Sequence, residues 1–392
     1  GVSWTQFVQL QPCTCPVMAW MLYVLLAAWA VVEVAFYLVC RHYLSPIMNR
    51  LSKPPKYPMD SSKLMLKILD TVDWLGANAG HYDWKRFLSG WFRGAPPSEV
   101  WRDNFLEFGA WAMYARELGD ITREERAALD SIVAHWEERY MHKFPPGYNP
   151  HVRSIRFTLE PEVPFLPRPL ALYVLLMCLR KVMRLWMRLQ GFRRLSTPRG
   201  TTYWYRKVEG GRSGNNGCGG AAADRPEWPL PIVFLHGVGL GLPAYGLLVR
   251  KTCLKRTAVI VENFSVSMGL HLLRGHTPPS EEEFVDDIAG IMRRHGIARA
   301  TYLGHSFGSI GVAWMTRHHP ELVAQVALID PVCLLLFLPD VAANFLSPHT
   351  TYASARQRVL KYLVTQEKGI THTIHRHFWW YRNTLWPEDL KG

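Results

Sequence analysis

The sequence predicts an α/β fold over its C-terminal half, with a mostly parallel sheet and flanking helices, joined to a helical N-terminal half. Three observations predict this arrangement. From residue 229 onward, short apolar runs alternate with amphipathic segments, as strands and helices do in a parallel sheet with right-handed crossovers. Residues 61–145 instead repeat apolar side chains at helical spacing. Residues 17–39 form one uninterrupted apolar run that contains a single charge.

The apolar run 17–39 is long enough to cross the ~30 Å hydrocarbon core of a bilayer as one tilted helix. Its only charged residue is Glu33, which we expect to face a partner or lie near an interface, because a carboxylate in lipid is costly. Basic residues follow the run, whereas residues 1–16 carry no charge. The positive-inside tendency therefore predicts a single-pass membrane protein whose bulk is cytosolic, with residues 1–60 as anchor and basic flank.

The chain carries a formal net charge of +13, which suggests an anionic partner. Zinc-finger, RRM and basic-zipper patterns are absent from the sequence, so we expect a membrane surface and no nucleic acid as that partner. Within residues 161–195, arginines and lysines alternate with apolar side chains such as Val182 and Leu189. This pattern is typical of a helix in the membrane interface with its basic face toward anionic headgroups. The alternative is a solvated amphipathic helix that packs on the protein.

Residues 61–160 are expected to form a helical region. Thr122 and Glu125 have the spacing of a capping box, which predicts a helix that runs to about Met141. Ser98 follows two prolines and is predicted to be the N-cap of the helix that follows it, over 99–118. Aromatic residues recur at helical spacing in that helix, and we interpret them as a packed face rather than a cofactor box: Trp101, Phe105, Phe108 and Trp111.

Residues 196–392 contain the expected sheet. A turn at 198–200 predicts a hairpin, and residues 209–225 are a glycine-rich connector. Buried strands are expected at "LPIVFLHG" (230–237) and at 257–263, and further strands at 300–306 and at 324–332. Ser280 and Glu283 form a second capping box, which predicts a helix over 280–296.

The stretch "LGHSFGSIG", residues 303–311, places one serine between glycines. An apolar strand precedes it and a small-residue helix follows, which is the context that a nucleophilic serine on a tight turn requires. Such a turn strains the backbone of Ser306 and exposes its Oγ above the sheet. The N-terminus of the following helix adds positive potential where an oxyanion would form.

An acyl-transfer site needs two hydrogen-bond donors for the developing oxyanion. The amide of Phe307, directly after the serine, is one candidate. The loop that follows "FLHGVG", residues 234–239, supplies the other, most simply the amide of Val238. Both signals follow predicted strands, and together they predict a serine nucleophile with an oxyanion hole.

These motifs resemble the α/β-hydrolase superfamily over residues 196–392. "FLHGVG" resembles its oxyanion loop, "GHSFG" its nucleophile elbow, and "RHHPELV" (317–323) the end of the helix after the elbow. The whole chain is similar to membrane-anchored hydrolases of fungi and algae that have a long helical N-terminal half. The resemblance implies a serine hydrolase but fixes no substrate, since lipases, esterases, epoxide hydrolases and haloperoxidases share these motifs. Epoxide hydrolases have an aspartate where Ser306 stands.

The resemblance implies a triad in the order serine, acid, histidine, and here the sequence departs from it. After residue 332 we expect helices and no strands, so about 333–392 correspond to the family's cap region, and the chain is expected to stop before its acid and histidine. Asp330 ends a strand and is a candidate acid, although an aspartate that caps the turn is the alternative. The candidate bases are three: His372, His375 and His377.

We therefore expect a membrane-anchored serine hydrolase that cleaves an ester of an apolar or lipid substrate without a cofactor or metal. His372 and His375 share a helical face, but no carboxylate at a matching offset completes a metal site. His305 is expected to pack beneath the turn. The alternative is a non-catalytic α/β-hydrolase-like membrane protein that retains the serine turn as structure.

Overall fold

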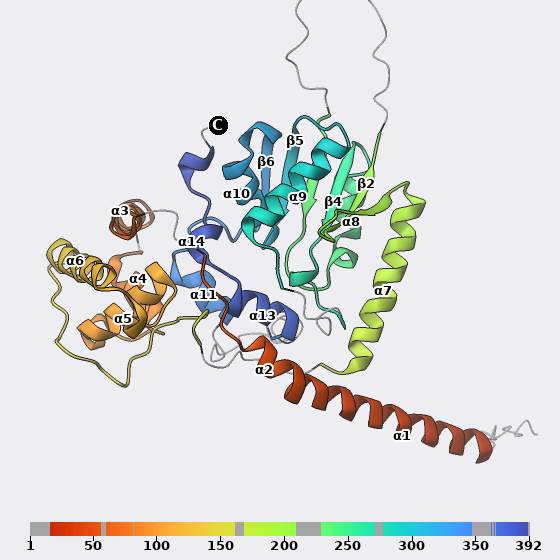
Figure 1. Cartoon of the computed structure of the whole chain (residues 1–392), viewed down its shortest axis with the longest axis horizontal. Helices are drawn as coiled ribbons and strands as arrows, with labels where there is room; N and C mark the ends of the chain where they lie inside the picture. The colour runs from red at the N-terminus through yellow and green to blue at the C-terminus, as the bar shows by residue number, and fades with distance from the viewer. Residues whose placement is uncertain are drawn as a thin grey trace, which may run out of the picture.

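The computed structural model describes residues 16–55, 60–80, 82–160, 168–208, 229–270, 277–346, 362, 364 and 366–390. The predicted glycine-rich connector lies outside these residues. Helices α3 to α6 gather on one side of the molecule and the sheet on the other, with α11, α13 and α14 between them (Figure 1). The helical N-terminal half and the sheet-containing half are thus connected by the last part of the chain.

The described strands form one sheet in the order β1-β2-β4-β3-β5-β6. The predicted hairpin forms β1 and β2, and β2 is also antiparallel to β4. The remaining pairs are parallel, so the sheet is mostly parallel, as predicted. The bounds of the strands are β1 Arg193–Ser196, β2 Thr202–Arg206, β3 Ile232–Leu235, β4 Ala258–Glu262, β5 Ala300–His305 and β6 Val323–Ile329.

Both faces of the sheet are covered, because side chains alternate along each strand. Val233 and Leu235 of β3 pack with α9 (Glu281–Arg294) and α10 (Gly308–His318). Ile232 and Phe234 face the other way, toward α7 (Leu170–Leu189) and α8 (Gly246–Thr252). Burial on both sides explains why β3 is apolar throughout.

The two predicted capping boxes are present. The Thr122 hydroxyl accepts from the Glu125 N–H and caps α6, and the Ser280 hydroxyl does the same for Glu283 at α9. The described helices of the N-terminal half are α3 Ser61–Ala79, α4 Trp84–Trp91, α5 Arg102–Tyr114 and α6 Arg123–Tyr140, with short 3₁₀ turns at Pro97–Glu99 and Leu118–Asp120.

The predicted cap at Ser98 is wrong. Ser98 lies in the 3₁₀ turn, and α5 begins at Arg102 without a side-chain cap. The carbonyl oxygens of Pro145 and Gly147 accept instead from the N–H groups of Arg102 and Asp103, at 2.8 and 3.0 Å. Carbonyl groups of a distant loop thus satisfy two N–H groups in the first turn of α5, and the sequence around Ser98 does not reveal these bonds.

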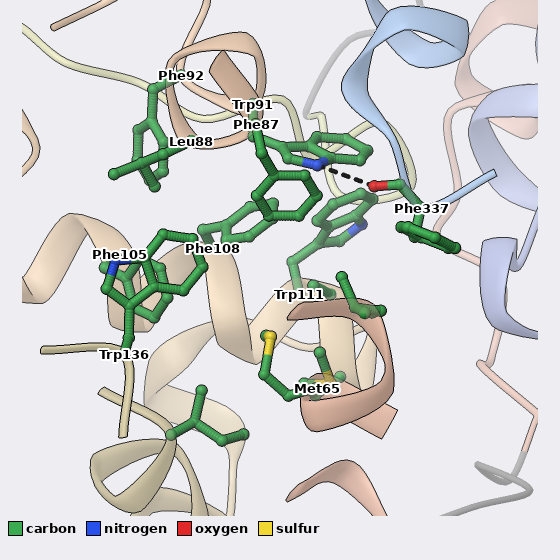
Figure 2. Packing of buried hydrophobic residues seen from close by; sticks show 14 of the residues in the cluster. Met65, Phe87, Leu88, Trp91, Phe92, Phe105, Phe108, Trp111, Trp136 and Phe337 are labelled. Atoms are coloured by element: carbon green, nitrogen blue, oxygen red, sulfur yellow. Dashed lines mark hydrogen bonds between the residues drawn. The ribbon is translucent and has the colours of Figure 1, made fainter. Parts of the chain in front are cut away.

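The C-terminal segment completes the core of the helical half. Figure 2 shows the Trp91 indole donating to the Phe337 carbonyl oxygen, at 3.1 Å, above a cluster of aromatic side chains. Trp380 donates in the same way to the carbonyl oxygen of Ala112, at 3.0 Å. Aromatic burial and these bonds therefore fix residues that follow β6 against helices from the first half of the chain.

No strand follows β6 in the part of the chain that the structure describes, as predicted. The segments 334–346 and 371–390 were each expected to be one helix. In the structure the first is helical only in its second part, and the second contains several short helices. The observed elements are α11 Pro339–Leu346, α13 Lys368–Arg376, α14 Trp380–Asn383 and a 3₁₀ turn at Pro387–Leu390. Most of 355–369 lies outside the described residues.

The first helix, α1 (Pro16–Leu38), continues through a π-helical turn, Val39–Leu44, into α2, Ser45–Met48. The stretch Val17–Met48 is the one described helix that is long and apolar enough to cross a membrane. Figure 1 shows α1 extending away from the rest of the molecule, and its side chains before Glu33 are nearly all exposed.

The partner expected for Glu33 is the start of α7. Its carboxylate accepts from the N–H groups of Leu170 and Ala171, at 2.7 and 2.9 Å. These N–H groups belong to the first turn of a helix, which favours a negative charge. Glu33 therefore attaches α1 to the N-terminal end of α7.

Candidate functional site

Ser306 lies on a strained turn between β5 and α10. Its φ is +50°, a left-handed conformation that is uncommon for a residue with a side chain. Its N–H donates to the carbonyl oxygen of Ile329 at 2.9 Å, which ties the turn to the end of β6. The strain that the motif predicts is thus present, and a hydrogen bond to the neighbouring strand holds it.

Glycines allow the turn to approach its neighbours closely. A Cβ on Gly308 would lie 2.1 Å from the carbonyl oxygen of Leu235, and one on Gly304 would lie 2.8 Å from Cα of Ser309. A Cβ on Gly237 would lie 2.8 Å from Cβ of Ser306. The loop after β3 therefore packs directly against the serine.

Ser309 stabilises the serine turn through hydrogen bonds of its side chain. The sequence did not predict this role. Its fully buried hydroxyl donates to the Ser306 carbonyl oxygen at 2.6 Å. The Ser309 Oγ in turn accepts from the N–H groups of Val332 and Cys333, at 3.1 and 3.3 Å. The segment after β6 is thereby held against the serine turn.

His236 is fixed as a neutral ring. Its Nε2 accepts from the Asn263 N–H at 3.0 Å, so its proton is on Nδ1, which donates to the Gly237 carbonyl oxygen at 2.8 Å. Complete burial lowers the pKa of His236 and maintains this state. His236 therefore joins the ends of β3 and β4 and shapes the loop before Val238.

Tyr245 is a second residue without a sequence signal. Its hydroxyl accepts from the Gly237 N–H at 3.0 Å and lies 2.8 Å from Nδ1 of His305. Since its lone pair receives the Gly237 proton, its own proton is available to His305. Burial lowers the pKa of His305, and the ring is held below the turn, where we expected it to pack.

The N–H groups of Val238 and Phe307 have no hydrogen-bond acceptor within the described ranges. Three neighbouring amides are engaged: Gly237 with Tyr245, Gly239 with Val266, and Ser306 with Ile329. Two unsatisfied amides beside a strained serine are the arrangement that an oxyanion hole requires.

The serine turn opens into an apolar cavity of about 50 Å³. Ser306, Phe307 and Val238 form one wall. The other walls come from distant parts of the chain: the helical half contributes Phe157, and the C-terminal segment contributes most of the rest. These residues are Val332, Leu336, Val341, Ala342, Ile374, Phe378 and Trp380.

The candidate bases are held elsewhere. His372 bonds through Nδ1 to the Met48 carbonyl oxygen at 2.9 Å, and its Nε2 lies 3.2 Å from that of His377. His377 also bonds Ser52, at 3.1 Å. Helix α13 thus brings Ile374 to the serine cavity, while these two histidines bind the last residue of α2 and the segment after it.

The Ser306 hydroxyl has no hydrogen-bond partner among the residues that the structure describes. Asp330 follows β6 with an exposed side chain and a φ of +46°. No hydrogen bond or ion pair joins Asp330 to any described residue. The structure therefore brings Ser306, Phe307 and Val238 together, but it does not bring His372, His375 or His377 to the serine.

The C-terminal histidines make stability depend on pH. Burial lowers the pKa of His375 to about 4 from 6.5. The folded state then favours the neutral ring, so this stabilisation is complete above pH ~6.5 and is lost as the pH falls toward 4, by about 1.4 kcal/mol per pH unit. We expect His375→Gln to flatten the fall in melting temperature between pH 7.5 and 5.

The exposed His151 provides the control for this experiment. His151→Gln should leave the pH dependence of the melting temperature as it is in the wild type. An equally steep acid loss in His375→Gln would show that protonation of His375 does not destabilise the fold.

Comparison with known proteins agrees with this fold. Residues 265–370 match the family model for the alpha/beta hydrolase fold. The sequence has no significant match among curated proteins. Together with the mostly parallel sheet and the serine turn, this match gives the sheet-containing half the α/β-hydrolase fold.

Several solved structures are similar to this chain. A hydrolase from Pseudomonas aeruginosa PA01 is 15% identical, with a TM-score of 0.29, and the match covers 49% of this chain and 73% of that one. Naproxen esterase (carboxylesterase NP) from Bacillus subtilis is 14% identical, with a TM-score of 0.30, and the match covers 47% of this chain and 61% of that one. A carboxylesterase from Nitrososphaera gargenis is 14% identical, with a TM-score of 0.29, and the match covers 49% of this chain and 72% of that one. At these identities the similarity concerns the fold, and no substrate follows from it.

Proposed function

We propose that this protein is a membrane-attached serine hydrolase that cleaves an ester of an apolar or lipid substrate. The proposal rests on one observation. Ser306, whose backbone is strained and whose hydroxyl has no described hydrogen-bond partner, lines one apolar cavity together with Val238 and Phe307, whose amides are unsatisfied. The family match adds a fold that hosts this chemistry.

In the proposed reaction Ser306 Oγ attacks the ester carbonyl carbon while its proton passes to a base. The carbonyl oxygen becomes an oxyanion that accepts from the N–H groups of Val238 and Phe307. Collapse of this intermediate breaks the C–O bond and leaves an acyl group on Ser306, which water then hydrolyses. The base has to come from outside the residues that the structure describes.

The cavity lining favours an apolar acyl group. Its walls are carbon-rich side chains such as Leu336, Ile374 and Phe378, and burial of each methylene contributes about 0.8 kcal/mol. An assay of the full chain in detergent with p-nitrophenyl acetate, butyrate and octanoate tests this. We expect hydrolysis that rises with acyl length and disappears in Ser306→Ala, and unchanged hydrolysis in that variant would contradict the proposal.

Membrane attachment is proposed through α1. The helix is apolar, exposed and extended from the body, so deletion of residues 17–39 should move much of the protein from carbonate-resistant membranes to the extractable fraction. The deleted protein's folding is checked by its melting temperature. Full carbonate resistance after the deletion would contradict a single anchor. The cytosolic orientation of the remaining chain stays a prediction from its basic flank.

A non-catalytic role is the second candidate, and one observation favours it. Within the described ranges no imidazole bonds the Ser306 hydroxyl, and two of the candidate bases, His372 and His377, are engaged with residues 48–52. Under this hypothesis the strained turn and its packing are retained for structure alone. The reactivity of Ser306 separates the two hypotheses.

A further inference from the structure

A second cavity, of about 550 Å³, lies between α7 and the β1–β2 edge of the sheet. Such a volume is in the range of small-molecule sites. It shares no lining residue with the serine cavity. Four of its lining residues are cationic, three from α7 and one from β1: Arg180, Lys181, Arg184 and Arg194.

Positive charge exceeds negative charge in this cavity. Two described carboxylates lie beside it. Glu367 accepts from the hydroxyl of the lining residue Tyr173 at 2.9 Å, and both Arg184 and Arg194 pair with Glu262, at 3.8 and 3.2 Å. Glu262 also accepts from the Trp204 indole at 2.6 Å. Arg180 instead donates to the Met268 carbonyl oxygen. Burial lowers the pKa of Arg180, which reflects the cost of holding a cation there.

The exposed face of α7 is apolar along its length. Successive spacings of four and three residues place one stripe of side chains on one side of the helix. All of them are exposed: Ala171, Leu175, Cys178, Val182, Leu185 and Leu189.

Basic residues separate this stripe from the cavity. On the helix, Lys181 and Arg188 fall between the apolar stripe and the face formed by Arg180 and Arg184. An apolar face bordered by cations is the pattern of a helix that lies at a membrane surface.

The apolar stripe continues into the helix proposed to enter the membrane. Glu33 joins α1 to the first turn of α7, and Figure 1 shows α1 extending past this end of α7. In the proposed attachment, a bilayer that contains the exposed part of α1 therefore lies beside the N-terminal end of this stripe.

We propose that the cavity between α7 and the β1–β2 edge binds the phosphate of an anionic membrane phospholipid. The guanidinium groups of Arg184 and Arg194 donate to the phosphate oxygens, and the acyl chains lie along the apolar stripe of α7. This site rests on the proposed membrane attachment, not on the proposed hydrolysis. A phosphate monoester fits it better than a zwitterionic headgroup, because no described lining residue of the cavity carries a carboxylate to pair with an ammonium.

Calorimetric titration of the full chain in a neutral detergent tests this. The ligands are dihexanoyl phosphatidic acid, dihexanoyl phosphatidylcholine and inorganic phosphate. We expect phosphatidic acid to bind at least about tenfold more tightly than either of the others, because it alone combines the charge with acyl chains. Arg194→Gln should weaken this binding about tenfold, the loss expected for one charge-assisted contact.

Controls separate the site from general electrostatics. Lys251→Gln removes one exposed charge from α8 and should leave the affinity unchanged, and Arg194→Lys should restore part of it. Ser306→Ala should bind as the wild type does, so this test is independent of the hydrolase proposal. Equal affinity for inorganic phosphate would indicate a free-anion site and overturn the lipid assignment. Equal losses in Arg194→Gln and Lys251→Gln, or no binding at all, would overturn the site.

Discussion

Replacing Ser306 with alanine is expected to abolish labelling of the chain by a fluorophosphonate probe. The probe reacts with an exposed serine hydroxyl whose phosphonyl oxygen can be held by oxyanion donors, and the turn offers the amides of Val238 and Phe307 for this. Labelling is measured by gel fluorescence and located by mass spectrometry. Ser265→Ala is the matched control, because the Ser265 hydroxyl makes no hydrogen bond with any residue that the structure describes, and it should label as the wild type does.

The rate of labelling reports whether a base reaches the serine. Loss of a triad base typically costs on the order of 10⁶ in rate, so the 392-residue chain should label slowly if its described histidines remain bonded elsewhere. Fast labelling that depends on Ser306 would place a base among the residues that the structure does not describe. Complete absence of labelling in a folded chain would favour the non-catalytic hypothesis.

The sequence predicted the features that are local. The serine turn, the hairpin and both capping boxes depend on residues within a few positions of one another, such as Ser280 and Glu283. The buried strand β3 was predictable because a strand covered on both faces is apolar throughout. The match to the α/β-hydrolase fold follows from the same local motifs around Ser306.

The remaining features depend on contacts between distant segments. The cap of α5 is supplied by carbonyl groups of 145–147, which overrides the local signal at Ser98. Tyr245 reaches Gly237 and His305 only after the sheet has formed. Phe157 and Ile374 meet at the serine cavity from segments more than two hundred positions apart. No local pattern encodes such meetings.

The expectation for Glu33 shows how far a local rule extends. The cost of a charge in an apolar run predicted that Glu33 has a partner, but not which one. The partner is a pair of backbone N–H groups at the start of α7. Because every helix begins with such groups, the sequence around Leu170 carried no specific signal.

Gly308→Ala is expected to lower the free energy of unfolding, because the added methyl group would clash with backbone atoms. The added Cβ would lie 2.1 Å from the Leu235 carbonyl oxygen and 3.0 Å from that of His236. Both atoms belong to the backbone around the end of β3 and cannot rotate away, so α10 has to move from the sheet. Forced overpacking of this kind costs about 3 kcal/mol, which lowers the melting temperature by roughly 10 °C in a domain of this size.

Gly290→Ala is the matched control, because it adds the same methyl group to the interior of the neighbouring helix α9. The nearest atom to its Cβ is the end of the Arg293 side chain, at 4.0 Å. Without a clash, the gain in helix propensity should stabilise the fold by up to about 1 kcal/mol. The melting temperature, measured by circular dichroism, should therefore shift in opposite directions for the two variants.

Because Gly308 directly follows the residues that form the serine turn, its variant should also lose fluorophosphonate labelling, whereas Gly290→Ala should keep it. Equal melting temperatures would mean that α10 is not held against β3 as described, and the geometry derived for Ser306 would then be wrong as well.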